Sequence, residues 1–317
     1  MNRFHAGEVA MQMRTGDAHR LAPLAPHILR PQLPLQHRDF FAQLPFVVVG
    51  AADRHGRLWA TLRAGAPGFA QSPDPGRLSL HAPPLNGDPL AADLAPGTPI
   101  GVLGLQAHTR RRNRANGRVL RSTAEQLDID IEQSFGNCPK YIHAREAHHA
   151  PLAGTPGGTV NADVLDTLDD RAAALITGAD TFFVASLGAG GADVSHRGGR
   201  PVFVHLADMR TLLVPDFAGN RFYMTLGNLL ADGRAGLAFV DRGARGLLLL
   251  SGRAEVVEGR AATVLAGAER GWRFHLQAAR RLQGVLPLTW VDGEAAPEVA
   301  ATGTWAEVLG AAAAAAP

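Results

Sequence analysis

Short apolar runs of strand length dominate the hydrophobic pattern of this chain. Turn residues such as those of residues 53–57 separate several of them. Apolar runs of four to eight residues bounded by Gly, Pro, Asn or Asp are typical of β-strands. We therefore expect a mainly-β protein. The expected strands cover residues 46–51, 58–64, 77–81, 99–106, 118–122, 129–133, 182–187, 201–206, 211–214, 237–240 and 247–257.

Helical patterns lie at the ends of the chain and between groups of strands. The clearest spans residues 160–177 and is amphipathic through Val164, Leu165, Leu168 and Ala172. A Gly/Pro/Thr cluster at residues 151–159 precedes it and predicts a linker. Further helices are expected at residues 1–20, 37–44, 88–94, 141–149, 222–230 and 263–283.

The two halves of the pattern repeat. Val47-Val48-Val49 matches Phe183-Val184-Ala185. The run starting at Leu78 matches the run at Leu212, and Gly117 matches Gly252, with nearly the same spacing along the chain in each case. Duplication of one small β-barrel domain is the simplest account. We expect a first half with a helical N-terminal extension over residues 1–150, a second half over 160–290, and an Ala-rich tail over 291–317.

Composition narrows the classes of partner. The 317 residues are 46% hydrophobic and 19% charged, which is typical of a folded globular protein. The 31 basic and 29 acidic residues nearly balance and aromatic residues make up 6%, so we expect no nucleic-acid partner.

The sequence also indicates where in the cell the protein is expected. Cys138 is the only cysteine, which fits a reducing compartment. No window has the pattern of a signal peptide or a membrane span, so we expect a cytoplasmic protein with no membrane partner.

Residues 192–230 carry the strongest candidate chemistry. A polar turn is expected at residues 193–199, followed by strand-like runs, the segment 215–221 and a helix-like segment. Backbone N–H groups left open by the glycines, together with hydroxyls, arginines and a helix N-terminus, provide the donors and partial positive charge that bind a phosphate. The alternative is a surface turn whose glycines serve only positive φ angles.

This stretch resembles the flavin-binding half of the pyridoxamine 5'-phosphate oxidase-like split-barrel proteins. Their hallmark is a D-x-S-x-R-G-[GD] turn, then P-D-x-x-G-N, then T-L-x-N. The resemblance continues through residues 4–8 and 133–141, and departs at His196, where proline is common. The matching residues are Asp193, Ser195, Arg197, Gly198, Gly199, Pro215, Asp216, Gly219, Asn220, Thr225, Leu226 and Asn228.

The resemblance implies two tandem split β-barrels that form a pseudo-dimer with peripheral helices, and an FMN held between the halves. It also implies an FMN-dependent oxidoreductase acting on an unidentified small molecule, with NAD(P)H as a candidate partner. The chain would be a monomeric pseudo-dimer or a homodimer. The expected cofactor contacts are Ser195, His196, Arg197, Gly198, Gly199, Asp216, Asn220, Arg221, Thr225, Asn228, Gln133, Ser134 and Lys140.

Several alternatives stay open. The arginine run at residues 110–114 could hold a phosphate, an anionic substrate or another chain; a solvated hairpin is slightly favoured, although this run recurs in the family. The loop 134–139 lies either over the flavin or between domains without a role. A non-catalytic flavin or haem binder is the alternative function, and His196 is the candidate ligand for haem. A barrel without a cofactor, used for protein contacts, is a third possibility.

Two further questions concern the number of sites. The first half has Ala64-Gly65-Ala66-Pro67-Gly68 in place of the Ser-x-Arg-Gly turn, so the sequence leaves open whether one or two flavins bind per chain. No metal site is expected, because position 147, one helical turn after His143, is alanine.

Overall fold

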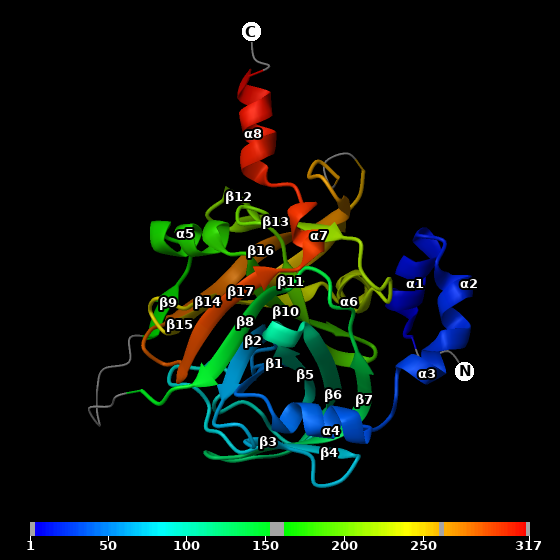
Figure 1. Cartoon of the computed structure of the whole chain (residues 1–317), viewed down its shortest axis with the longest axis vertical. Coiled ribbons are helices and arrows are strands. Elements are labelled where there is room, and N and C mark those ends of the chain that lie inside the picture. The colour runs from blue at the N-terminus through cyan, green and yellow to red at the C-terminus, as the bar shows by residue number, and fades with distance from the viewer. Residues whose placement is uncertain (1–3, 153–161, 260–262, 315–317) are drawn as a thin grey trace.

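Two antiparallel sheets carry the fold of the computed structural model, which describes residues 4–152, 162–259 and 263–314 (Figure 1). The first sheet has the strand order β2-β1-β5-β6-β7-β4-β3 and the second has β11-β10-β14-β15-β16-β13-β12. Strand for strand the two orders are the same, so the predicted duplication and the mainly-β, tandem split-barrel fold are confirmed.

The first sheet comprises β1 (Phe46–Ala52), β2 (Leu58–Ala64), β3 (Ala70–Gln71), β4 (Arg77–Leu80), β5 (Pro99–Gln106), β6 (Arg111–Ser122) and β7 (Leu127–Gly136). The second comprises β10 (Thr181–Gly188), β11 (Gly191–Gly198), β12 (His205–Asp208), β13 (Thr211–Phe217), β14 (Arg234–Asp241), β15 (Gly246–Val257) and β16 (Ala268–Leu282).

A β-bulge marks the same position in both sheets. The pairing shifts between Asn116 and Gly117 in the first sheet and between Ser251 and Gly252 in the second. A Cβ atom on Gly117 would lie 1.8 Å from a carbonyl oxygen of the partner strand, and one on Gly252 would lie 2.0 Å away. Only glycine fits such a close approach, and the expected match between these two glycines is confirmed.

The match expected between Val47 and Phe183 is wrong by one position. Val47 pairs with Arg63, and Phe182 pairs with Arg197. The two arginines correspond, because the following Gly65 and Gly199 each lie against the phenylalanine four residues later. Val47 therefore matches Phe182, and this one-position shift matters because it moves every side chain to the other face of a strand.

The two sheets pack through reciprocal contacts that define a pseudo-twofold axis. A Cβ atom on Gly50 of β1 would lie 2.8 Å from the Cβ of Ala185 in β10. Gly101 of β5 packs on the backbone of Asp193 in β11, and Gly236 of β14 packs on the backbone of Trp59 in β2. The tandem chain thus builds within itself the kind of interface that a homodimer forms between subunits.

A two-stranded ribbon completes this symmetry. It pairs β8 (His143–His149) with β17 (Leu288–Ala295), the strands that follow β7 and β16, and Glu146 lies opposite Val291. In Figure 1 the ribbon runs across the middle of the molecule. Each half therefore contributes one strand to it.

Helices surround the sheets, and the expected ones near residues 37–44 and 222–230 are confirmed. The helix expected from residue 160 begins only after Asp169, whose side chain accepts a hydrogen bond from the Ala172 amide, and β9 (Ala162–Leu165) precedes it. No helix within the described ranges has the length and apolarity needed to cross a bilayer. The helices are α1 (Ala6–Arg14), α2 (Ala18–Leu21), η1 (Ala22–Leu24), α3 (Ala25–Ile28), α4 (Leu35–Ala42), η2 (Ala107–Thr109), α5 (Asp170–Gly178), α6 (Met224–Ala231), α7 (Pro297–Ala300) and α8 (Trp305–Ala314).

Other expectations about local structure are wrong. Residues 141–149 and 263–283 do not form helices; they contain β8 and β16, and residues 88–94 form turns. In β16 the buried residues Trp272, Phe274 and Leu276 alternate with more exposed ones, which is the two-residue period of a strand. The polar turn expected at 193–199 lies mostly in β11, because pairing with β10 extends it to Gly198. The expected linker falls mainly outside the described residues.

Candidate functional site

A cavity of about 110 Å³, which we call the arginine pocket, lies between the two halves. It is bounded by β6, the loop after β7, β11 and the connection from β13 to α6. Segments far apart in the sequence therefore converge on one seam. The first half contributes Arg112, Arg114, Asn137, Cys138, Lys140 and Tyr141, and the second contributes Ser195, His196, Arg197, Gly198, Asp216, Phe217, Asn220, Arg221, Tyr223 and Thr225.

Arg112 is the most unusual side chain of this pocket. It is 9% exposed, donates from Nη1 to His196 Nδ1 at 3.0 Å, and donates from Nη2 to the carbonyl oxygens of Cys138 and Lys140. Among the described residues no carboxylate forms an ion pair with it. Burial, together with the nearby guanidinium groups of Arg114 and Arg197, lowers the pKa of Arg112 to about 10. A buried cation without a counter-charge is costly, so the pocket favours an anion.

Arg197 is held at the opposite wall by a shared carboxylate. Its Nη1 lies 2.5 Å from Asp216 Oδ1, and Arg270 Nη1 lies 3.2 Å from Asp216 Oδ2. Asp216 thus aligns two cations. Arg221 pairs with Asp17 and Glu269 instead.

A chain of hydrogen bonds connects the two halves beneath the pocket. Thr225 Oγ1 donates to Ser195 Oγ at 2.8 Å, and Ser195 Oγ lies 3.4 Å from Asp193 Oδ2. Asp193 also accepts from Arg114 Nη1 at 2.5 Å and from Asn116 Nδ2 at 3.0 Å. All five side chains are buried, so the hydroxyls of Ser195 and Thr225 are held in fixed positions.

Four of the predicted contacts do not line this pocket. Ser134 is fully buried and its Oγ lies 2.6 Å from His37 Nδ1. Burial, together with Arg30 and Arg111, lowers the pKa of His37 to about 4. Asn228 Oδ1 lies 2.7 Å from His5 Nε2. Gln133 and Gly199 also lie outside the pocket lining.

The solvated hairpin slightly favoured for residues 110–114 is wrong for Arg112 and Arg114, which are buried and line this pocket. Only Arg110 occupies the turn, with a φ of 56°. The signal was present, because residues 112, 114 and 116 alternate onto one face of a strand. Asp193, the partner of Arg114, was recognised only as part of the turn motif.

The N-terminal helix α1 covers the back of α6. The carboxylate of Glu8 is buried and accepts a hydrogen bond from the His5 amide at 2.8 Å. Burial raises the pKa of Glu8 to about 8, so this side chain is protonated at neutral pH. Gly7 and Gly227 allow the two helices to approach, since a Cβ on Gly7 would lie 2.1 Å from the Gly227 oxygen.

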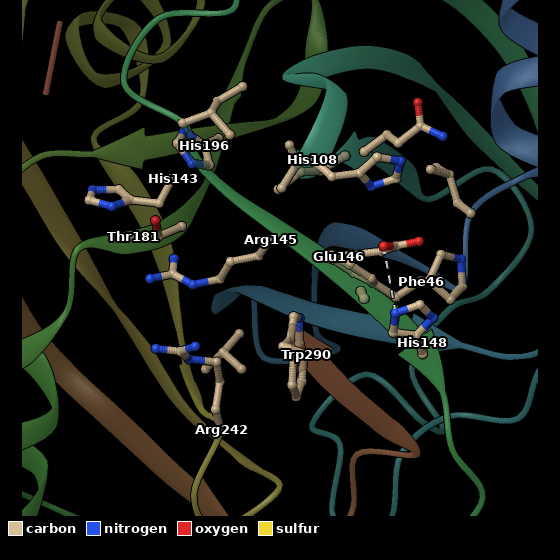
Figure 2. A pocket seen from close by; sticks show the side chains of 18 of the residues that line it. Phe46, His108, His143, Arg145, Glu146, His148, Thr181, His196, Arg242 and Trp290 are labelled. Atoms are coloured by element: carbon tan, nitrogen blue, oxygen red, sulfur yellow. Dashed lines mark ion pairs between the residues drawn. The ribbon is translucent and has the colours of Figure 1, made fainter. Parts of the chain in front are cut away.

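A second, larger cavity of about 990 Å³, which we call the central cavity, lies beside the ribbon (Figure 2). Its walls come from equivalent places in the two halves: the starts of β1 and β10 and the ends of β5 and β14. Strand β8 runs along it, and Figure 2 shows His143, Arg145 and His148 on that strand with Trp290 nearby. His196 borders both cavities.

His196 is poorly suited to ligate haem iron. Because arginine can only donate, the Arg112 contact requires Nδ1 of His196 to accept, so the proton of the neutral ring is on Nε2. Burial and the charge of Arg112 lower the pKa of His196 well below its usual value. Neither ring nitrogen then has a free lone pair. No group of three metal-ligating side chains occurs in the described part of the chain.

By its strand order this chain is a tandem split-barrel protein, and it resembles the pyridoxamine 5'-phosphate oxidase-like proteins. No family model and no curated protein matches it.

Three solved structures illustrate the resemblance. HupZ of Group A Streptococcus is 21% identical over 38% of this chain and 97% of its own, with a TM-score of 0.31. A protein of the pyridoxinephosphate oxidase family from Clostridium acetobutylicum, related to general stress protein 26, is 13% identical over 44% and 94%, with a TM-score of 0.29. An FAD-binding protein from Mesorhizobium loti is 12% identical over 39% and 99%, with a TM-score of 0.28.

Proposed function

We propose that this chain binds FMN and that the arginine pocket holds the phosphate group. The supporting observation is Arg112, a buried guanidinium that borders the pocket and has no carboxylate partner among the described residues. A phosphate monoester carries about −1.5 to −2 charges and three acceptor oxygens. It would supply the missing counter-charge.

The donors of the pocket fit such a group. Lys140 and Arg197 also line the pocket, and Ser195 and Thr225 add hydroxyls. The buried Nε atoms of Arg112, Arg114 and Arg197 have no hydrogen-bond partner within the protein. Guanidinium groups bind phosphate through paired, charge-assisted hydrogen bonds.

The pocket is too small for a whole flavin, since small-molecule sites measure about 300–1,000 Å³. Its 110 Å³ fit the phosphate and the neighbouring ribityl carbons, so the isoalloxazine ring would lie outside it. Tyr141, Phe217 and Tyr223 line the same pocket and offer apolar faces. Bound flavin would supply hydride or electron transfer, while this chain's residues anchor and orient it.

We propose further that the chain is an FMN-dependent oxidoreductase acting on a small organic molecule, with NAD(P)H or oxygen as the second reactant. A carrier that binds FMN without turnover is the alternative. Steady oxidation of NADH or NADPH by the FMN-loaded protein, faster than free FMN alone, supports the enzyme. The carrier is supported if FMN binds stoichiometrically and neither NADH nor NADPH is oxidised when oxygen or a panel of organic acceptors is supplied.

A comparison of FMN with riboflavin tests the phosphate site. The wild-type protein should bind FMN at least about tenfold more tightly, because a hydrogen bond to a charged group contributes roughly 1.5–3 kcal/mol. Arg112→Gln should remove most of this preference. The control Arg118→Gln, on the same strand but paired at the surface with Glu132, should keep it. An unchanged preference in Arg112→Gln would contradict the placement.

Cys138 provides a second readout, because the only cysteine of the chain lines the same pocket. FMN should slow the alkylation of Cys138 by iodoacetamide, which intact-protein mass spectrometry measures over time. Riboflavin at the same concentration should slow it less. Equal alkylation rates with and without saturating FMN would place the phosphate elsewhere.

A further inference from the structure

We infer that the central cavity is a second binding site and that it takes a planar aromatic molecule without a negative charge. At about 990 Å³ it lies at the upper end of the range for small-molecule sites. It is separate from the arginine pocket except at His196, which borders both. Its binding of such a molecule does not depend on the proposed flavin function.

The arginines of this cavity are already paired with carboxylates. Arg145 Nη1 lies 2.9 Å from Asp180 Oδ1, and Arg145 Nε lies 2.7 Å from Asp292 Oδ1. Arg242 Nη1 also contacts Asp292, at 2.6 Å. In contrast to Arg112, no arginine of this cavity lacks a carboxylate among the described residues, so an anionic ligand would find no free cation. Glu146, which lines the cavity with Nε2 of His148 3.9 Å from its carboxylate, also disfavours an anion.

The remaining lining fits an aromatic ring. Phe46 and Phe183 are buried on the two pseudo-equivalent halves, and Trp290 of β17 is half-buried beside them. Figure 2 shows Phe46 and Trp290 among the side chains that line the cavity. Apolar walls with a few polar groups that fix orientation are the usual composition of small-molecule sites.

Amide and imidazole side chains complete the lining. Gln43 and Gln106 border the cavity and lie within 3.5 Å of each other, and the histidines His108 and His149 border it as well. Neutral imidazole and amide groups both donate and accept. A ligand with a ring carbonyl or a ring nitrogen would be satisfied without bringing a charge.

Acridone and acridone-4-carboxylate form a matched pair of probes, measured by equilibrium dialysis against the full chain. Acridone should bind and its carboxylate should bind at least about tenfold more weakly, because an unpaired buried charge is costly. Trp290→Ala should weaken acridone binding by about two- to tenfold, the range for one aromatic contact. Ala147→Trp, which fills the cavity from β8, should abolish it.

Controls separate this proposal from a general loss of structure and from the flavin proposal. Trp305→Ala removes an aromatic ring that stacks on His205 away from the cavity and should leave acridone binding unchanged. The FMN-loaded protein should bind acridone as the FMN-free protein does. Equal affinity for acridone and its carboxylate would overturn the proposal. So would unchanged acridone binding in an Ala147→Trp variant that keeps the wild-type thermal transition, or competition between FMN and acridone.

Discussion

The duplicated fold produces two equivalent seams, and in the described part of the chain they differ: one contains a cavity and the other buries its arginine. The open seam contains the arginine pocket around Arg197 of β11. The closed seam lies around Arg63 of β2, the first-half equivalent of Arg197, and there the arginine is 1% exposed. One backbone architecture thus supports both a polar cavity and a packed core.

Substitutions on the strands that face each arginine account for the difference. In the alignment that matches Gly117 with Gly252, Leu247 and Leu249 of β15 stand where β6 has Arg112 and Arg114, and both leucines are fully buried in the apolar core. In the alignment that matches Arg63 with Arg197, Ala82 stands where the open seam has Asp216. Arg63 Nη1 donates to the Ala82 carbonyl at 3.1 Å. Apolar side chains in place of charged ones let the closed seam bury Arg63.

Asp216→Ala, which copies the residue of the closed seam, should have the largest effect. It removes the carboxylate shared by Arg197 and Arg270, and breaking a buried ion pair costs about 3–5 kcal/mol. Thermal unfolding should occur at a clearly lower temperature, and inorganic phosphate should restore part of the loss. The control Glu132→Ala removes a surface partner of Arg118 and should change little. Wild-type stability of Asp216→Ala, without a response to phosphate, would refute this account of the open seam.

Arg112→Leu, which copies Leu247, should separate binding from stability. FMN affinity should fall by about 10- to 100-fold, since one charge-assisted contact is lost. The unfolding temperature should stay the same or rise, because a buried cation without a counter-charge gives way to an apolar side chain. Isothermal titration and calorimetric melting measure the two effects. A large loss of stability would mean that Arg112 acts mainly as a structural residue.

The closed seam should bind no cofactor, so one FMN per chain is expected. Released flavin measured against protein concentration gives the ratio directly. Arg63→Met should leave that ratio and the FMN affinity unchanged. Two flavins per chain, or loss of flavin in Arg63→Met, would show that the closed seam opens in solution.

The smallest expected effect concerns Glu8, whose helix packs on α6 of the second half. Helix α6 connects β13 to β14, whereas the equivalent connection between β4 and β5 in the first half contains no helix. The pKa of Glu8 rises from its usual 4.5 to about 8 on burial. The folded state then binds more protons than the unfolded state, so stability should fall as pH increases from about 4.5 to 8.

Glu8→Gln tests this pH dependence. The variant should have a flatter dependence of unfolding temperature on pH, and at pH 9 it should be more stable than wild type. Parallel curves for the two proteins between pH 5 and 9 would show that Glu8 stays ionised in the folded protein.

The amino-acid sequence by itself determined most of the strands, though not β16, and it also determined their duplication and the candidate phosphate-binding motif. Apolar runs such as residues 46–51 and 247–257 report their own period, because burial of one or both strand faces acts on near neighbours. The same local reasoning failed for β8. Its His- and Arg-containing sequence has no strand period, and pairing with the distant strand β17 made it a strand.

Only the tertiary structure decided which charged residues face a cavity. Arg63 and Arg197 occupy equivalent positions in the sequence repeat, yet their surroundings come from opposite halves of the chain: Leu247 and Leu249 for one, Arg112 and Arg114 for the other. The central cavity likewise exists only because the two barrels and the ribbon meet at the pseudo-twofold axis. Burial, ion pairing and enclosed volume depend on contacts between distant segments, and local sequence patterns do not record those contacts.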